Sequence, residues 1–301
     1  MNLLLENVNL NSNSGPNHFA QKLKNYLSLR GVTFNNFMPH DKKLTFIESS
    51  WNRTDLDMYL RLDGIYFNAG FDCNKMNANI KASYEAAKGV IFQTDFNRDL
   101  VFNWFGEHPN YTVINNGADT MAIKQFRPNQ KFADSIKTEG DIWACAASWH
   151  SFKRLKENIK YFLKFSNSKD RMVIAGNNCD HLIDNPRITY VGNLNLTELY
   201  TLYSVSKYFI HLAYLDHCPN VVVDARAFGC RIICSSSGGT KEVAGQDAII
   251  VEEPDWDFSF IKEDRPPPLS FANIKTNIYN SDISMVKAAK KYHSFLKEQK
   301  C

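Results

Sequence analysis

The stretch from 211 to 245 constrains the fold most, because it reads as a strand, a loop, a helix, a second strand and a glycine-rich loop. The apolar runs at 208–212 and 231–234 are typical of buried strands. Pro219 suits the first turn of the helix between them, where a missing N–H costs nothing. Two buried strands joined by a helix are the repeating unit of a parallel sheet with helices on its faces. The stretch therefore predicts an α/β chain.

The same alternation runs through most of the sequence. Strands are expected at 3–5, 32–37, 44–47, 59–67, 89–93, 111–114, 142–146, 172–175, 188–191 and 248–251. Helices are expected from Pro16 to Gly31 and at 79–87, 95–105, 153–165, 196–205, 219–228 and 283–298. The pattern breaks between 121 and 131 at Pro128 and several polar residues, which is typical of a domain boundary. We therefore predict three parts: 1–124, 125–278 and a terminal helix within 279–301.

Composition excludes several classes of protein. The chain has 301 residues, enough for one large domain or two of ordinary size, and 44% of them are hydrophobic, which allows sizeable buried cores. A net charge of +3 without a long basic stripe argues against a nucleic-acid partner. Seven cysteines without a C-x-x-C pair indicate reduced thiols in a cytoplasm, not disulfides or a zinc site. No apolar run approaches the ~20 residues of a membrane span, so we expect a soluble protein, with peripheral membrane contact left open.

Two acids flank the start of the helix predicted at 219–228. Asp216 precedes it and Asp224 lies inside it, so the backbone N–H groups of 220–222, which attract anions, lie between two carboxylates. Ser148, Gly176 and the loop 235–239 also follow strands directly, and ligands of parallel sheets bind at the carboxyl ends of strands. An anion site between two carboxylates suits a sugar nucleotide, with its diphosphate on the amides and its hydroxyls on the acids.

With these pieces in order, the chain resembles the retaining glycosyltransferases of family 4. Four segments carry the resemblance: VINNGAD at 113–119, AASWHSFKRLKENIKYF at 146–162, MVIAG at 172–176 with the run 188–216, and the last helix-and-loop segment ending in SSSGGTKEVAG at 235–245. The resemblance implies the GT-B fold, in which two Rossmann-like domains with parallel sheets face a cleft. It also implies an acceptor-binding first domain, a donor-binding second domain and a terminal helix that crosses back to the first.

The resemblance also implies roles for the residues of the second half. Asp216 matches the acid beside the transferred sugar and Lys153 the lysine on the donor diphosphate, so both are assigned as catalytic. Asp224 matches the acid on the ribose. Each acid is one methylene shorter than the family glutamate, and the family arginine is replaced by Ser148, with Arg154 as a neighbouring source of charge. The donor-binding set is Ser148, Arg154, Asn220, Val221, Asp224, Gly238, Gly239, Thr240 and Glu242.

The first half offers fewer residues for a site. Gly15 would let the backbone approach a ligand closely, or simply allow a tight turn. Asp63 would orient an acceptor hydroxyl, or its Asp-Gly pair would only turn the chain. Asn116, in the VINNGAD loop, completes the residues expected near the acceptor. The histidine that the family often has near the reacting centre has three candidates without motif support: His18, His40 and His108.

The function expected from the resemblance is transfer of a hexose from a nucleotide diphosphate sugar to an acceptor hydroxyl, with retention. The acceptor would be a glycan, a lipid-linked sugar or a protein-linked sugar, in cytoplasmic glycan biosynthesis. The nucleotide sugar is a co-substrate, and neither a cofactor nor a metal is expected. Two alternatives stay open: a non-catalytic protein that binds sugar nucleotides or a partner through a decayed site, and another GT-B enzyme such as an epimerase. A dehydrogenase is disfavoured, because the three-glycine dinucleotide fingerprint is missing.

Overall fold

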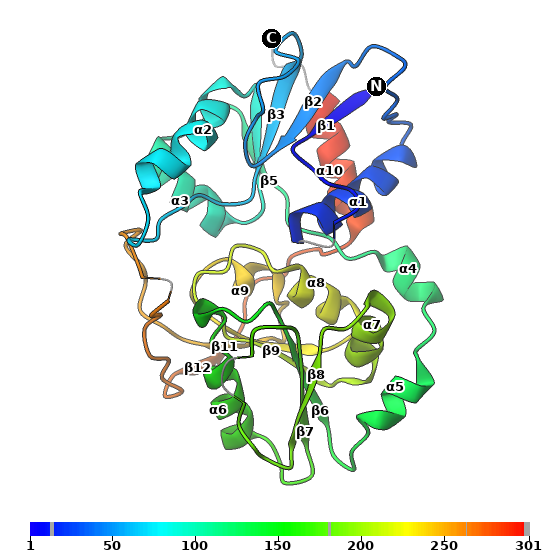
Figure 1. Ribbon diagram of the computed structural model, residues 1–301, viewed down its shortest axis with the longest axis vertical. Helices are drawn as coiled ribbons and strands as arrows, with labels where there is room; N and C mark the ends of the chain where they lie inside the picture. The colour runs from blue at the N-terminus through cyan, green and yellow to red at the C-terminus, as the bar shows by residue number, and fades with distance from the viewer. Residues whose placement is uncertain (13–14, 180–181, 263, 298–301) are drawn as a thin grey trace. The chain divides into compact units, whose positions relative to one another are not determined.

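A computed structural model describes residues 1–12, 15–179, 182–262 and 264–297. The chain divides into two compact units, each an α/β domain (Figure 1). The N-terminal domain contains Met1–Asp119, Asp257–Ile261 and the chain from Asp282. The C-terminal domain contains Thr120–Trp256 and Lys262–Ser281. The final helix therefore belongs to the first domain by its packing, although it follows the second in sequence.

The N-terminal domain is built on a five-stranded sheet in the order β1-β2-β3-β4-β5. All four neighbouring pairs of strands are parallel. The bounds are β1 Leu3–Glu6, α1 Gly15–Ser28, β2 Lys42–Phe46, β3 Asp57–Leu62, α2 Cys73–Ala86, β4 Gly89–Phe92, α3 Asp95–Phe105, β5 Tyr111–Val113 and α10 Met285–Lys297. Thr94 caps α3 by accepting a hydrogen bond from the backbone N–H of Asn97, and Gly106 ends the helix with a φ of 87°.

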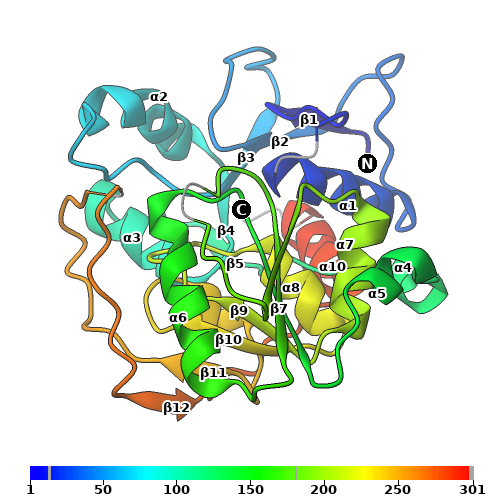
Figure 2. The same ribbon diagram turned by 60° about the horizontal axis from the view of Figure 1, so that its bottom comes forward.

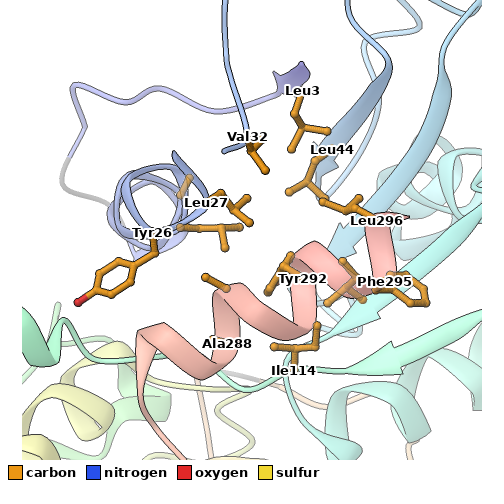
Figure 3. Packing of buried hydrophobic residues seen from close by; sticks show 14 of the residues in the cluster. Leu3, Tyr26, Leu27, Val32, Leu44, Ile114, Ala288, Tyr292, Phe295 and Leu296 are labelled. Carbon is orange, nitrogen blue, oxygen red and sulfur yellow. The ribbon is translucent and has the colours of Figure 1, made fainter. Parts of the chain in front are cut away.

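Helix α10 packs beside α1 against one face of this sheet (Figure 3). Tyr292, Phe295 and Leu296 of α10 join Leu44 of β2 in one cluster of buried side chains. Burying these apolar side chains stabilises the contact by roughly 1.5–3 kcal/mol for each fully buried one. Hydrophobic burial thus holds the end of the chain on the first domain.

The strand expected at 32–37 does not form. Only Thr33 makes a bridge, to Asn2. The side-chain amide of Asn2 donates to the carbonyl oxygens of Asn35, Met38 and Pro39, which ties this segment down without a strand ladder. The prediction was wrong because the apolar pattern there included Phe37, whose side chain is 98% exposed.

The C-terminal domain has a seven-stranded sheet in the order β12-β11-β10-β9-β6-β7-β8. Its strands pair in parallel except for the edge strand β12, which is antiparallel to β11 and was not expected. The bounds are α4 Thr120–Gln125, α5 Gln130–Ser135, β6 Ile142–Ala146, η1 Ser151–Lys153, α6 Leu155–Phe165, β7 Arg171–Ala175, β8 Ile188–Gly192, α7 Leu196–Val205, β9 Tyr208–His211, α8 Asn220–Ala227, β10 Arg231–Ser235, α9 Thr240–Val243, β11 Ile249–Val251 and β12 Ile274–Thr276.

Helices cover both faces of this second sheet (Figure 2). Phe162 of α6 packs on Trp143 of β6, with ring centroids 5.6 Å apart. Tyr203 of α7 packs on Phe209 of β9, with ring centroids 5.5 Å apart. Alternate residues of a strand point to opposite faces, and Ile210, next to Phe209, belongs to the core cluster on the α6 side. The helices α6 and α7 therefore lie on opposite faces.

Helix α6 begins two residues later than the sequence predicts. The segment Ser151–Lys153 forms a short 3-10 turn, and Arg154 then takes a left-handed conformation with a φ of 52°. The buried Asn158 side chain donates to the carbonyl oxygens of Lys153 and Arg154 at 3.1 and 2.9 Å. This turn places Lys153 before the α-helix instead of on it.

Candidate functional site

The residues predicted for the donor site follow strands that are neighbours in the C-terminal sheet. Asp216 follows β9, the loop Ser235–Gly239 begins at the end of β10, and Ser148 follows β6. The order β10-β9-β6-β7 with parallel pairing brings the carboxyl ends of these strands to one edge. This edge is where ligands bind in parallel α/β sheets.

Asp216 is the centre of this edge. Its Oδ2 accepts from Nζ of Lys153 at 2.5 Å and lies 2.8 Å from Nε2 of His211. The side chains of Asp216, Lys153 and His211 are 13%, 18% and 3% exposed. The structure thus brings the two residues assigned as catalytic into one ion pair. It adds His211, the last residue of β9, which the sequence argument did not include.

The charges of this trio fix its protonation states. Burial would raise the pKa of the Asp216 carboxyl, but the Lys153 ammonium and the His211 hydrogen bond outweigh burial and hold that pKa well below its usual range. Burial is the largest cause that lowers the pKa of His211, and the nearby charge of Lys153 lowers it further, against the opposing effect of Asp216. At neutral pH the site therefore contains an ammonium, a carboxylate and a neutral imidazole.

The glycine-rich loop packs directly on the backbone of Asp216. The N–H of Gly239 donates to the Asp216 carbonyl oxygen at 2.8 Å. Gly238 has a φ of 75°, and a Cβ at that position would lie 2.6 Å from the same oxygen. Only glycine tolerates both the left-handed conformation and this contact. Gly238 is therefore needed for the close approach of this loop to Asp216, and Gly239 contributes its backbone N–H.

Asn158 joins the Lys153 turn to the end of β9. Besides its bonds to that turn, its Oδ1 accepts from the backbone N–H of Leu212 at 3.0 Å, and the residue is fully buried. One side chain thus fixes the backbone on both sides of the Lys153–Asp216 ion pair. Asn158 was not expected from the sequence, where it is one polar residue in an amphipathic helix.

Arg154, predicted to bind the donor, instead forms a buried ion pair. Its guanidinium donates to both carboxylate oxygens of Glu253 at 2.7 Å and to the carbonyl oxygen of Pro267 at 2.7 Å. The Arg154 side chain is 1% exposed, and Glu253 also accepts from Ser237 at 2.9 Å. The left-handed backbone of Arg154 directs its guanidinium to this internal pair. Ser148, at the position of the family arginine, is exposed, and Arg154 does not replace the missing charge there.

The remaining donor-site residues lie on and around α8. Asp224 is 5% exposed, and its charge adds to burial in raising the pKa of Tyr203 on α7. Pro219 precedes α8, whose first residues are Asn220 and Val221. The N–H of Val222, expected to face an anion, instead donates to the Pro219 carbonyl oxygen at 3.1 Å.

Beside the glycine loop, Thr240 and Glu242 of α9 are buried, at 1% and 7% exposure. Within the described residues, Oγ1 of Thr240 has no hydrogen-bond partner. A buried hydroxyl without a partner carries a desolvation cost that a ligand atom would relieve. Thr240 thus holds a buried hydroxyl without a protein partner next to the glycine loop.

In the N-terminal domain the structure groups Asp63 and Asn116 around a buried arginine. Arg61 of β3 is 1% exposed and forms an ion pair with Asp63. It also donates to Oδ1 of Asn116 at 2.8 Å and to the hydroxyl of Tyr292 on α10 at 3.1 Å. The sequence signal for this cluster was an arginine in an otherwise apolar strand. Gly15, also assigned to the acceptor region, is the first residue of α1.

The model shows neither a metal cluster nor a membrane span in the part of the chain that it describes. No group of three or more His, Cys, Asp or Glu side chains in 1–12, 15–179, 182–262 and 264–297 could hold a metal ion. No helix within these same residues is long and apolar enough to cross a bilayer.

Comparison with known proteins agrees with this architecture. Residues 127–259 match the family model described as glycosyl transferases group 1. No curated protein sequence matches the chain. Alr3699/HepE of Anabaena, solved with UDP and glucose, is similar in structure, with a TM-score of 0.68 at 11% identity over 98% of this chain and 99% of that one. A glycosyltransferase of Rickettsia africae has a TM-score of 0.66 at 13% identity over 99% of both chains.

A third solved structure, sucrose-phosphate synthase of Thermosynechococcus elongatus, has a TM-score of 0.64 at 12% identity over 85% of this chain and 86% of that one. At such low identity these likenesses show the fold. The chain therefore has the GT-B fold of two Rossmann-like domains, and its segment 127–259 carries the sequence pattern of glycosyl transferases group 1.

Proposed function

We propose that the protein is a retaining, metal-independent glycosyltransferase of family 4, which transfers a hexose from a nucleotide diphosphate sugar to an acceptor hydroxyl. The observation that carries the proposal is the cluster of Lys153, Asp216 and the Gly238–Gly239 loop at the carboxyl edge of the C-terminal sheet. The group 1 match covers this whole cluster. UDP and glucose, with which the Anabaena protein was solved, are of the proposed class.

Each residue of the cluster has a part in binding the donor. The Lys153 ammonium, 2.5 Å from Oδ2 of Asp216, would exchange part of that contact for the diphosphate. It would then stabilise the negative charge that develops on the leaving phosphate, an electrostatic contribution to catalysis. Asp216 would accept a hydrogen bond from a hydroxyl of the transferred sugar, and Asp224 would accept from the ribose hydroxyls.

Retention would follow from attack on the face that the leaving group departs from. The bond between the anomeric carbon and the phosphate oxygen breaks, and a bond from that carbon to the acceptor oxygen forms on the same side. The acceptor proton passes to the departing phosphate oxygen, so the step needs no base from the protein. Asp63 and Asn116, grouped by Arg61 in the N-terminal domain, are the proposed contacts of the acceptor. We place the reaction in the cytoplasm, with a glycan or a lipid-linked sugar as the acceptor.

Calorimetry with UDP-, GDP- and ADP-sugars tests the donor site. We expect one of the three to bind, and Asp224→Ala to weaken binding at least tenfold, because a hydrogen bond to a charged group contributes about 1.5–3 kcal/mol. Asp134→Ala, which removes an acid from α5 in the same domain, is the matched control and should bind as the wild type does. The site assignment fails if no nucleotide sugar binds, or if Asp224→Ala binds as tightly as the wild type.

The stereochemical proposal has a separate test. Proton NMR of the first product formed gives the configuration at its anomeric carbon. An axial donor bond that yields an axial product bond supports retention. An equatorial product bond would refute the retaining mechanism while leaving donor binding intact.

A non-catalytic sugar-nucleotide-binding protein is the second candidate. It is favoured by the pairing of Lys153 with Asp216 and of Arg154 with Glu253. A diphosphate would then meet one exchangeable cation at the Lys153 turn, since Arg154 is buried. Slow hydrolysis of a bound donor, followed by release of free sugar, decides between the candidates, because a binding protein gives none above the buffer rate.

A further inference from the structure

We propose that His211 is a positioning residue, which holds Oδ2 of Asp216 so that Oδ1 of the same carboxylate is presented to a hydroxyl of the bound sugar. This inference rests on the proposed function, because the sugar hydroxyl belongs to the donor. It assigns to β9 a residue that the sequence argument for the site did not contain.

The two donors to Asp216 share one oxygen. Nε2 of His211 lies 2.8 Å and Nζ of Lys153 lies 2.5 Å from Oδ2. No hydrogen bond within the described residues reaches Oδ1, and the side chain retains 13% exposure. A carboxylate has lone pairs on both oxygens, so one oxygen is held by the protein and the other can accept from a ligand.

His211 is the more rigid of the two donors. It ends β9, where it is paired with Cys234 of β10, and its ring is stacked at an angle of 15° with that of Phe209. Its side chain is 3% exposed, against 18% for Lys153. Lysine has a long stem with high rotamer entropy, whereas a buried ring on a strand has little freedom left to lose. The fixed contact on Asp216 is therefore the one from His211.

The charge balance also favours a neutral histidine. The charged groups that face the ring are the Asp216 carboxylate on the following loop and the Lys153 ammonium on the 3-10 turn. One cation already balances the one carboxylate, and burial lowers the pKa of His211. A neutral imidazole donates to a carboxylate only as the tautomer protonated on Nε2. His211 thus orients Asp216 without adding a second positive charge.

The contact from His211 matters most when the donor is bound. A diphosphate attracts Lys153, and Asp216 then depends on His211 for its orientation. Loss of the His211 N–H should therefore impair turnover of the sugar more than binding of the nucleotide. A residue that only filled space would affect both through stability.

Two variants separate the N–H group from the shape of the ring. His211→Phe keeps an aromatic ring beside Phe209 without a donor, and His211→Gln keeps an N–H near the position of Nε2. We expect kcat/KM for the donor to fall roughly 10- to 100-fold in His211→Phe, as for loss of a hydrogen bond to a charged group, and to stay within about threefold of wild type in His211→Gln. The Kd for the free nucleoside diphosphate should rise by a smaller factor than kcat/KM falls in His211→Phe, because Lys153 exchanges only part of its contact with Asp216, and should stay within about threefold in His211→Gln.

His108→Phe is the matched control. His108 is also buried, at 6% exposure, but its ring nitrogens lie against the backbone oxygens of Ala87 and Asn110, and its ring packs edge-on against Tyr84, all in the N-terminal domain. This variant should lose stability without a change in the ratio of kcat/KM to nucleotide affinity. Equal damage from His211→Phe and His211→Gln, or no damage from either, would overturn the positioning role.

Nitrogen NMR of the imidazole tests the hold on Asp216 without any substrate. At pH 7 we expect the His211 signals of a neutral ring protonated on Nε2, and a loss of that tautomer preference in Asp216→Ala. A ring protonated on Nδ1 in the wild type would overturn the inference. If the protein shows the expected tautomer but neither binds nor turns over any nucleotide sugar, the proposed function is wrong. The hydrogen bond from His211 to Asp216 would still be confirmed.

Discussion

Replacing Arg154 with methionine tests whether this arginine stabilises the domain or binds the donor. In the structure its guanidinium forms two hydrogen bonds to Glu253 and one to the carbonyl oxygen of Pro267, all at 2.7 Å. The side chains of Arg154 and Glu253 are 1% and 5% exposed. Arg154→Met leaves Glu253 as a buried carboxylate whose remaining side-chain donor is Ser237.

The expected loss follows from that burial. Removing one partner of a buried ion pair costs about 3–5 kcal/mol, because the other charge stays buried without compensation. In a domain of this size 1 kcal/mol corresponds to roughly 2–4 °C in Tm, so we expect the C-terminal domain to melt roughly 6–20 °C lower. Arg154→Met combined with Glu253→Leu removes both charges and should recover most of that loss, since a buried pair replaced by apolar groups is often neutral.

Differential scanning calorimetry on the wild type, both single variants and the double variant completes a double-mutant cycle. The reasoning requires a coupling free energy above about 2 kcal/mol between the two positions. A single variant that costs under about 1 kcal/mol, or a double variant as unstable as the sum of the singles, would show that Arg154 does not stabilise the domain through Glu253. A stable Arg154→Met protein with lost nucleotide affinity would return Arg154 to the donor site.

Three further outcomes are expected. Gly238→Ala should cut donor turnover at least tenfold, because its Cβ would lie 2.6 Å from the backbone of Asp216. Gly229 also has a positive φ, but a Cβ there would have no atom within 4 Å. Gly229→Ala should therefore lose only about 1 kcal/mol of stability, measured by chemical unfolding. The free energy of unfolding should fall as the pH drops below the usual histidine pKa of 6.5, because the unfolded state binds a proton there that the buried His211 of the folded state does not. In His211→Gln, the free energy of unfolding should depend less on pH over this range, as measured by unfolding curves at several pH values. Tyr292→Phe should destabilise the N-terminal domain by about 1–3 kcal/mol, measured by denaturant titration, because Arg61 loses its Nε partner; an unchanged midpoint would contradict this.

The fold was predictable because its signals are local and repeated. The apolar run 208–212, Pro219 and the run 231–234 correspond to β9, the start of α8 and β10 within a residue or two. These segments are buried on both sides, and continuous apolar runs report such burial directly. The strand expected at 32–37 does not form, because the side chain of Asn2, distant in sequence, binds a backbone carbonyl oxygen of that segment.

The site was predictable only in part. Asp216 and the Gly238–Gly239 loop could be placed at one edge of the sheet from the sequence, because each follows a strand. The network of Arg154 with Glu253 could not, since it joins positions 99 residues apart in the sequence. The same holds for Arg61 and Tyr292, whose contact spans 231 residues. Partners at such separations are set by packing, which leaves no periodic trace in the sequence.

Lys153 and Asp216 contact one another, so their roles in binding a donor depend on each other. Each was assigned its own role, the lysine on the diphosphate and the acid on the sugar, yet their side chains form an ion pair with one another at 2.5 Å. A donor that carries both a diphosphate and a sugar can compensate both halves of this pair at once, whereas inorganic diphosphate can compensate only the lysine. The pair should therefore discriminate against bare diphosphate, because removing Lys153 alone would leave the largely buried Asp216 carboxylate with His211 as its one donor among the described residues.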